Sequence, residues 1–207
     1  MFFCCDLTAA SMSAFIPTIL TELGWTARLA QAMSISVWLM GIATQLSGAW
    51  VSGRTDLRYP FILGGILLVL VGWAINIAYS EGRGISPAIR YLSLICMSAG
   101  TFIQMTLTTS WLANNLRGRA SLAMGTAIIL GIGNCANFVS SNVFIKKEAP
   151  YYPTAFKTGL GVTVAGAIMC LVYVGVLWRH NQKLDRIRCE SGSMDALNDH
   201  QIYRYQY

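Results

Sequence analysis

The sequence has few charged residues for its length. Of its 207 residues, 12% are Asp, Glu, Lys or Arg, whereas 55% are hydrophobic. A soluble domain usually carries about 25% charged residues, so this composition argues against a soluble globular domain and indicates a membrane protein. The net charge of +6 does not indicate a nucleic-acid surface, because the basic residues are dispersed and not interleaved with aromatic ones.

The chain also lacks the residue clusters that catalysis or metal binding requires. Both histidines, His180 and His200, follow the last long apolar run. The six cysteines form no Cys-x-x-Cys pair, and five of them lie in apolar segments, where they are expected to act as small hydrophobic residues. No paired carboxylates occur in the apolar runs. We therefore expect no enzymatic activity, no metal ion and no cofactor.

Most of the sequence consists of runs that contain no Asp, Glu, Lys or Arg. A helix crossing a bilayer core of about 30 Å needs about 20 residues. Five of the six runs reach this length, and the first does so only if it begins at Met1 and includes Asp6. No run alternates as a membrane β-strand does, and a helix satisfies its own backbone in lipid. The runs are Leu7–Thr21, Leu29–Gly53, Tyr59–Ser80, Tyr91–Leu116, Ala120–Ile145 and Thr158–Trp178.

These runs predict an all-α membrane protein with six transmembrane helices in residues 1–180. Residues 181–207 are polar and are expected to form a cytoplasmic tail, mostly disordered after a short helical extension. The loops after the second and fourth runs carry Arg54, Arg58, Arg117 and Arg119. Together with four basic residues at the start of the tail, these arginines make eight basic residues on one side of the membrane, against six on the opposite side. This bias predicts that both termini are cytoplasmic.

Polar side chains occur at helical spacing inside two runs. Thr101, Gln104 and Thr108 share one face of the fourth helix, and Asn134 and Asn137 share one face of the fifth. They are candidates for a cavity lining that binds a polar solute, and Ser11 in the first run is a further candidate. The alternative is that they form hydrogen bonds between helices, worth about 0.6–2 kcal/mol each. Both interpretations remain open at this stage.

Asp6 is the one ionisable group within an apolar span. A carboxylate in the middle of a span costs roughly 2.5–3.5 kcal/mol on insertion scales, so Asp6 is a candidate for carrying a coupling proton. Its place near the start of the helix also allows a position at the membrane interface. No Arg or Lys lies within any span, so the sequence offers no cation inside the membrane for an anionic solute.

The fifth run carries a second pattern, made of small residues. Ala123, Ala127 and Gly131 recur every four residues, which is the spacing of a small-residue seam that lets two helices approach closely. We expect this seam to be a packing surface.

Several motifs follow one another along the chain. They are Phe15–Ile19, Leu23–Ala27, Ala49–Ser52 with Arg54, Pro60–Ile62, Gly72–Trp73, Trp111, Asn114–Gly118, Gly133–Asn134, Ser141–Ile145 and Glu148–Pro153. Together they resemble the second half of a major facilitator superfamily transporter, in particular the fungal anion:cation symporter family of allantoate, nicotinate and pantothenate permeases. The resemblance covers about Phe2 to Arg188 and is most specific between Trp111 and Pro153.

This resemblance implies helices 7–12 of a twelve-helix carrier. The first helix of each triplet would line the central cavity, the second would flank it and the third would be peripheral. The arginines at 54, 58, 117 and 119 would belong to cytoplasmic gating loops, the first two in the loop that carries the family's G-x-x-x-D-R-type motif. In this chain Gly53 stands at the acidic position of that motif, and Asp56 is displaced by three residues.

The resulting expectation is transport of a small organic anion, either a carboxylate or a vitamin-like solute, by proton-coupled symport. The chain would act as part of a carrier, with a missing N-terminal six-helix half or a second copy as partner, in the lipid bilayer of the plasma membrane. No nucleic-acid partner is expected. The alternative is a non-transporting six-helix membrane protein that packs against a full carrier or forms homodimers.

Overall fold

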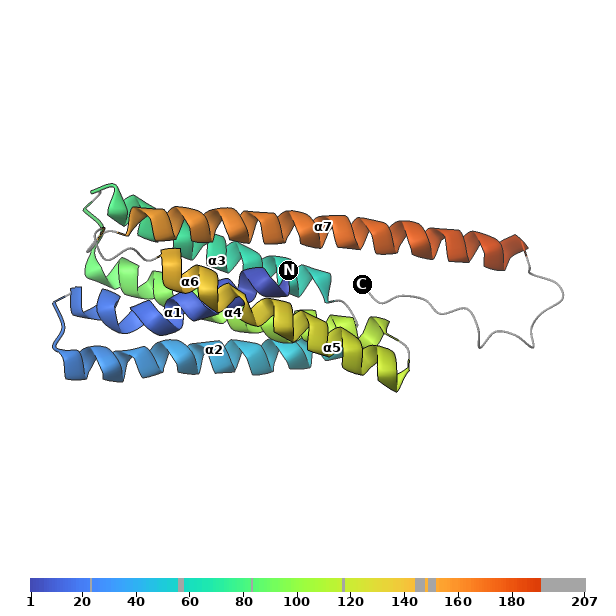
Figure 1. The fold of residues 1–207 in the computed structure, drawn as a ribbon, viewed down its shortest axis with the longest axis horizontal. Helices are drawn as coiled ribbons and strands as arrows, with labels where there is room; N and C mark the ends of the chain where they lie inside the picture. The colour runs from blue at the N-terminus through green and yellow to red at the C-terminus, as the bar shows by residue number, and fades with distance from the viewer. Residues whose placement is uncertain are drawn as a thin grey trace.

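Long helices make up the described part of the chain (Figure 1). The computed structural model describes residues 1–22, 24–55, 58–82, 84–116, 118–143, 148 and 152–190, with residues 22 and 184–190 described by their backbone alone. No strand occurs in these ranges. The helices are α1 (Phe2–Glu22), α2 (Ala27–Thr55), α3 (Tyr59–Ser80), α4 (Pro87–Asn115), α5 (Arg119–Asn134), α6 (Ala136–Val143) and α7 (Pro153–Glu190).

Six segments of this part are long and apolar enough to cross a membrane, which confirms the predicted all-α class and the number of spans. The fifth span, Arg119–Val143, consists of α5 and α6 and is interrupted at Cys135. There the backbone N–H of Cys135 donates to the carbonyl of Ile132 at 3.2 Å, a three-residue spacing that tightens the helix. Beside the break, the Asn134 side chain donates to the Leu130 carbonyl at 2.9 Å. Such side-chain bonds compete with the helical ladder.

The helices are longer than the charge-free runs, and this corrects one expectation. Arg28, Arg54 and Arg119 belong to helix ends, because a helix continues past the hydrocarbon core and long basic side chains extend to the interface. Arg90 directly precedes the charge-free run Tyr91–Leu116. It lies in the first turn of α4, is fully buried, and stacks its guanidinium on the Tyr79 ring at 3.8 Å from the centroid. The C-terminal helix α7 continues to Glu190, and residues 191–207 lie outside the described part.

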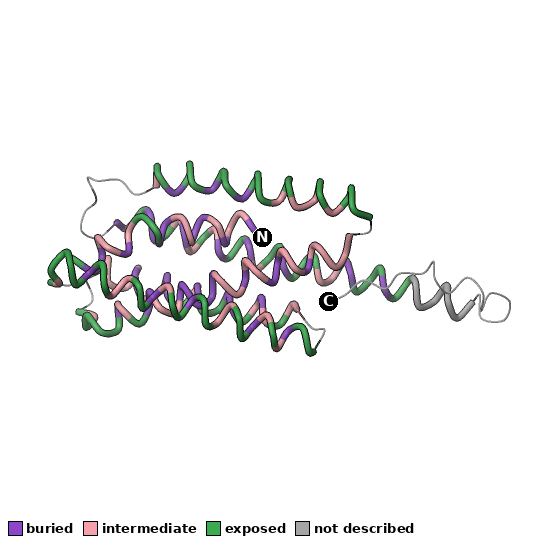
Figure 2. Tube along the Cα trace, turned by 90° about the horizontal axis from the view of Figure 1, so that it is seen from below, coloured by how far each residue is buried: buried purple, intermediate pink, exposed green. Residues whose placement is uncertain are grey.

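Helices α1 and α4 occupy the centre of the bundle and are its most buried spans. Helix α4 contacts α1, α2 and α3, while α7 packs mainly on α3 and α5–α6 pack on α1. Figure 2 shows the buried residues concentrated toward the middle of the bundle. The starts of α1, α3 and α5 and the ends of α2, α4 and α7 point toward the same end of the molecule (Figure 1). That end carries Arg54, Arg58 and Arg119.

Two glycines bring α3 and α4 into backbone contact. A Cβ atom on Gly100 would overlap the carbonyl oxygen of Gly65, and one on Gly65 would lie 2.9 Å from the carbonyl oxygen of Gly100. Both contacts would be closer than Cβ atoms normally approach other atoms. Small residues therefore set the separation of these helices, as expected where packing in lipid depends on close van der Waals contact.

Gly100→Ala is expected to destabilise the protein by about 1–3 kcal/mol, because the added methyl group overpacks the α3–α4 contact. Gly64→Ala, on the partner helix α3, is the matched control, since a Cβ atom on Gly64 would have no other atom within 4 Å. Thermal unfolding in detergent measures both variants. Equal melting temperatures for the two variants would show that the glycine contact does not determine the separation of α3 and α4.

Candidate functional site

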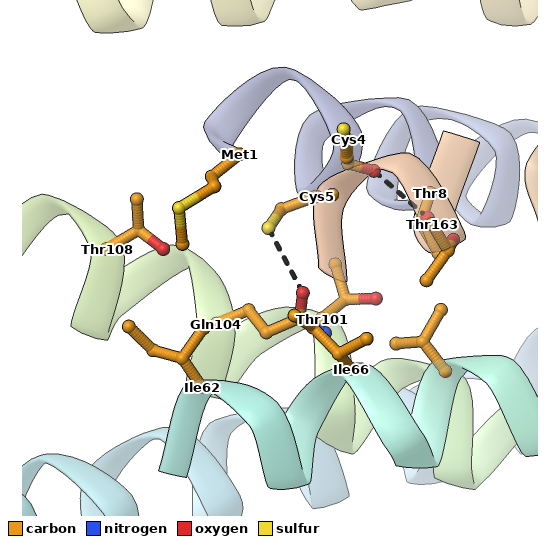
Figure 3. A pocket seen from close by; sticks show the side chains of 12 residues that line it. Met1, Cys4, Cys5, Thr8, Ile62, Ile66, Thr101, Gln104, Thr108 and Thr163 are labelled. Carbon is orange, nitrogen blue, oxygen red and sulfur yellow. Dashed lines mark hydrogen bonds between the residues drawn. The ribbon is translucent and has the colours of Figure 1, made fainter. Parts of the chain in front are cut away.

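Three polar residues predicted to line a cavity are buried together on α4. Thr101, Gln104 and Thr108 line a narrow interior pocket between α1, α3, α4 and α7 (Figure 3). The thiol of Cys5 on α1 donates to Oε1 of Gln104 at 3.4 Å. The full lining is Met1, Cys4, Cys5, Thr8, Ile62, Ile66, Val69, Thr101, Gln104, Thr108, Thr163 and Gly166.

This interior pocket has a volume of about 10 Å³. That volume corresponds to about one water molecule and is far smaller than the roughly 300–1,000 Å³ of a typical ligand site. The hydroxyls of Thr101 and Thr108 find no hydrogen-bond partner among the described residues. The pocket can therefore order a small polar molecule between helices, but in this arrangement it cannot enclose an organic solute.

The two asparagines of the fifth span lie elsewhere. Asn134 and Asn137 are exposed, and their amides donate to carbonyls of their own span, at 2.9 Å to Leu130 and at 3.1 Å to Asn134. The structure therefore does not bring them together with Gln104. Periodicity could not reveal this, since it shows that residues share a helix face but not which neighbour that face meets.

Ser11 and Asp6 both mark the contact of α1 with the fifth span. The Ser11 and Ser140 hydroxyl oxygens form a buried hydrogen bond of 3.2 Å, which joins α1 to α6. Asp6 is half-buried, and its Oδ2 atom would lie 3.0 Å from a Cβ on Gly133, with the Phe2 ring still closer to that position. Gly133 thus permits α1 to approach α5 at the level of the Asp6 carboxylate, two residues before the break at Cys135.

The basic residues of the loops differ in their surroundings. Arg54 is exposed and stacks on Trp50 at 4.1 Å from the ring centroid. Arg119 is exposed at the start of α5, and Arg117 lies outside the described residues. Arg58 differs from both, because its guanidinium donates to the hydroxyl of Ser110 on α4. Sequence reasoning missed this pair, whose members are 52 residues apart.

A larger and open cavity lies where α2, α4 and α5 meet. Its volume is about 490 Å³, within the range of small-molecule sites. The polar part of its wall comes from Gln45 on α2 and from a second face of α4, which holds Thr106, Thr109 and Ser110. The spacing of these α4 residues, i, i+3 and i+4, was the available sequence signal. The full lining is Phe2, Gln45, Phe102, Met105, Thr106, Thr109, Ser110, Ala113 and Leu130.

An apolar cavity of about 540 Å³ adjoins α5 and α7. Its wall includes Trp111, which is 2% exposed and meets Tyr173 edge-on with ring centroids 4.8 Å apart. Apart from Thr108, the lining consists of Gly125 and apolar or aromatic residues. This cavity offers little to orient a polar solute, so the cavity between α2, α4 and α5 is the better candidate for binding one.

Comparison with known proteins identifies transporters. The chain is 30% identical over 95% of its length to an uncharacterized transporter of Schizosaccharomyces pombe. It is 30% identical over 89% of its length to a high-affinity nicotinic acid transporter of Saccharomyces cerevisiae, and 28% identical over 84% to an MFS-type transporter of Penicillium expansum. No family model and no solved structure matches the chain.

The matched regions correspond to 39%, 34% and 33% of these three relatives. The chain therefore spans between a third and two-fifths of the length of the transporters it matches. Its six membrane-spanning helices account for one half of the fold that the resemblance implies. The resemblance inferred from the sequence motifs is thereby confirmed: the chain is a six-helix stretch related to transporters of the major facilitator superfamily.

Proposed function

We propose that the chain forms the C-terminal half of a carrier that moves a small organic carboxylate across a membrane, coupled to protons. The observation that carries this proposal is the 30% identity to a nicotinic acid transporter over 89% of the chain. Nicotinic acid is a small aromatic carboxylate, so it fits the solute class expected from the motifs. The open cavity between α2, α4 and α5, with its polar and aromatic wall, supports the same class.

The exposed faces of α2 and α5 support a partner half. Gln31, Ser36 and Ser47 are exposed on α2, and the seam residues Ala123 and Gly131 are exposed on α5. Polar side chains facing lipid are unfavourable, and a small-residue seam gains most from a helix packed closely on it. A second six-helix half would cover these faces and enclose the cavity. The alternative partner is a second copy of this chain.

Within this carrier we assign Gln104 to the α1–α4 contact, because it reaches only the closed interior pocket and accepts a bond from Cys5. Thr101 and Thr108 share this assignment. Asn134 and Asn137 lie on the exposed face of the fifth span, where they would meet the partner half. Asp6 is the proposed proton carrier, and the plasma membrane is the proposed location.

Uptake by proteoliposomes tests the need for a partner. The chain alone is expected to take up labelled nicotinate at the empty-liposome rate, and co-reconstitution with the N-terminal half of the nicotinic acid transporter is expected to raise uptake, since only then is the cavity enclosed. Uptake by the chain alone would favour a second copy. Crosslinking through Cys135, exposed on the uncovered face, then distinguishes homodimers from monomers. No uptake with either partner would support the non-transporting alternative.

A further inference from the structure

We propose that the hydroxyls of Thr106 and Ser110 bind the carboxylate of the solute in the cavity between α2, α4 and α5, and that the Gln45 amide binds a second polar atom of the solute. The carboxylate nature of the solute rests on the function proposed above. The site itself rests on the composition of the cavity wall and on the hydrogen bonds that its polar side chains make.

The described residues that line this cavity are all uncharged, so an anion bound there is held by neutral donors. Four polar side chains contribute to the wall: Gln45 from α2 and Thr106, Thr109 and Ser110 from α4. Neutral donors suit an anion, because a hydrogen bond to an ionised acceptor is roughly twice as strong as one between neutral groups. The question is which of the four side chains has a donor that the protein does not already use.

Thr106 and Ser110 differ from Thr109 in this respect. Thr109 donates its hydroxyl proton to the Met105 carbonyl of its own helix at 3.0 Å. The Ser110 oxygen accepts a hydrogen bond from the Arg58 guanidinium, which leaves its proton for another acceptor, since a hydroxyl has one donor and two lone pairs. Neither Thr106 nor Ser110 donates a hydrogen bond to the part of the chain that the structure describes. Both hydroxyls can therefore donate to a ligand.

The spacing of these two hydroxyls suits a carboxylate. Thr106 and Ser110 lie one turn apart on α4, and residues at i and i+4 have Cβ atoms about 5–6 Å apart, so each hydroxyl can reach one carboxylate oxygen. Gln45 comes from a second helix. Its neighbour Thr44 donates to the Ala99 carbonyl of α4 at 3.3 Å, which joins α2 to α4. The Gln45 amide forms no hydrogen bond to the described residues, so it can bind a different part of the solute.

The rest of the wall suits an apolar or aromatic body. Phe2 and Phe102 supply aromatic rings, and Leu130 adds an aliphatic side chain from α5. The interior pocket around Gln104 also has hydroxyls in its lining, but its volume of about 10 Å³ is too small for an organic acid. The cavity between α2, α4 and α5 combines unused donors with about 490 Å³ of space. This combination favours a small acid with a flat body and a second polar atom.

Two matched substitutions on α4 test the hydroxyls. Thr106→Val and Thr109→Val delete the same group from the same cavity wall, but the Thr109 proton is already used within the helix. We expect Thr106→Val to weaken nicotinate binding to the purified chain by at least about tenfold, the value of a hydrogen bond to a charged group. Thr109→Val should leave it nearly unchanged. Nicotinamide, which has the same ring without the charge, should lose less affinity in Thr106→Val. Equal nicotinate affinities of the two variants would overturn the assignment.

Gln45→Leu tests the second contact. Nicotinate and benzoate share a carboxylate on an aromatic ring, but benzoate lacks the ring nitrogen, which can accept a hydrogen bond from an amide. Gln45→Leu should reduce the preference for nicotinate over benzoate by about two- to tenfold, the value of a neutral hydrogen bond, and leave benzoate binding nearly unchanged. Thr106→Val should weaken the binding of both acids alike. An unchanged preference in Gln45→Leu would overturn the role of the amide.

The outcomes for this site and for the proposed function can be told apart. Binding of nicotinamide but of neither acid, with a loss in Thr106→Val, would support the hydroxyl site and contradict the proposed solute class. No binding of any of the three ligands would overturn the site, whereas nicotinate uptake by the assembled carrier would still support the transport function. A misfolded Thr106→Val is recognised by its elution from a sizing column, and Ser110→Ala then replaces it with the same expected loss. Thr106→Ser keeps the hydroxyl and should keep the affinity.

Discussion

Replacing Asp6 with Asn is expected to abolish proton-driven accumulation of the solute by the assembled carrier. The carboxylate lies half-buried in a membrane span, against Gly133 and next to the break of the fifth span at Cys135. An amide of nearly the same shape cannot bind and release a proton. The measurement is solute accumulation in proteoliposomes with an acidic exterior, compared with solute exchange at equal pH on both sides.

The comparison separates coupling from binding. Asp6→Asn should remove accumulation above the external concentration while exchange continues, because exchange requires no net proton movement. Asp6→Glu is the control, since it keeps a titratable group and is expected to keep part of the accumulation. Undiminished accumulation by Asp6→Asn would contradict the proton-carrying role and favour a purely interfacial position for Asp6.

Trp111→Ala is expected to give the largest loss of stability. Trp111 is 2% exposed, packs edge-on against Tyr173 and belongs to the cluster that joins α3, α4 and α7. Removing a buried tryptophan costs about 3–5 kcal/mol in soluble proteins. We expect the lower end of that range here, because the unfolded reference in detergent is also apolar, so lost packing contacts dominate. Unfolding by heat or denaturant in detergent measures the change.

Trp50→Ala is the matched control, since Trp50 is 61% exposed on the outer face of α2. It should melt close to the unsubstituted chain. Similar losses for the two substitutions would show that the cluster around Trp111 does not hold α7 on the bundle. The expected difference follows from burial alone, since the two changes delete the same atoms.

The sequence was enough to predict the class of the protein and its relatives. The charge-free runs reach the length of a bilayer crossing, and backbone hydrogen bonding in lipid leaves helices as the solution. The fifth run was predicted as one helix, but Asn134 and Asn137 bond to nearby carbonyls and the helix breaks between them. Arg90 lies just outside the fourth charge-free run, Tyr91–Leu116, yet it is buried in the first turn of α4.

The sequence by itself therefore determined the six spans, the basic end of the bundle and the kinship with major facilitator transporters. Only the tertiary structure decided where the polar groups lie: Gln104 in a closed interior pocket, Asn134 on an exposed face, and Arg58 against the Ser110 hydroxyl of α4. The physical reason is that in lipid both the inner and outer faces of a helix are apolar. Hydrophobic periodicity then carries little information about which face of a helix points into the bundle. Contacts such as that of Arg58 with Ser110 join residues far apart in the sequence and depend on how the helices pack.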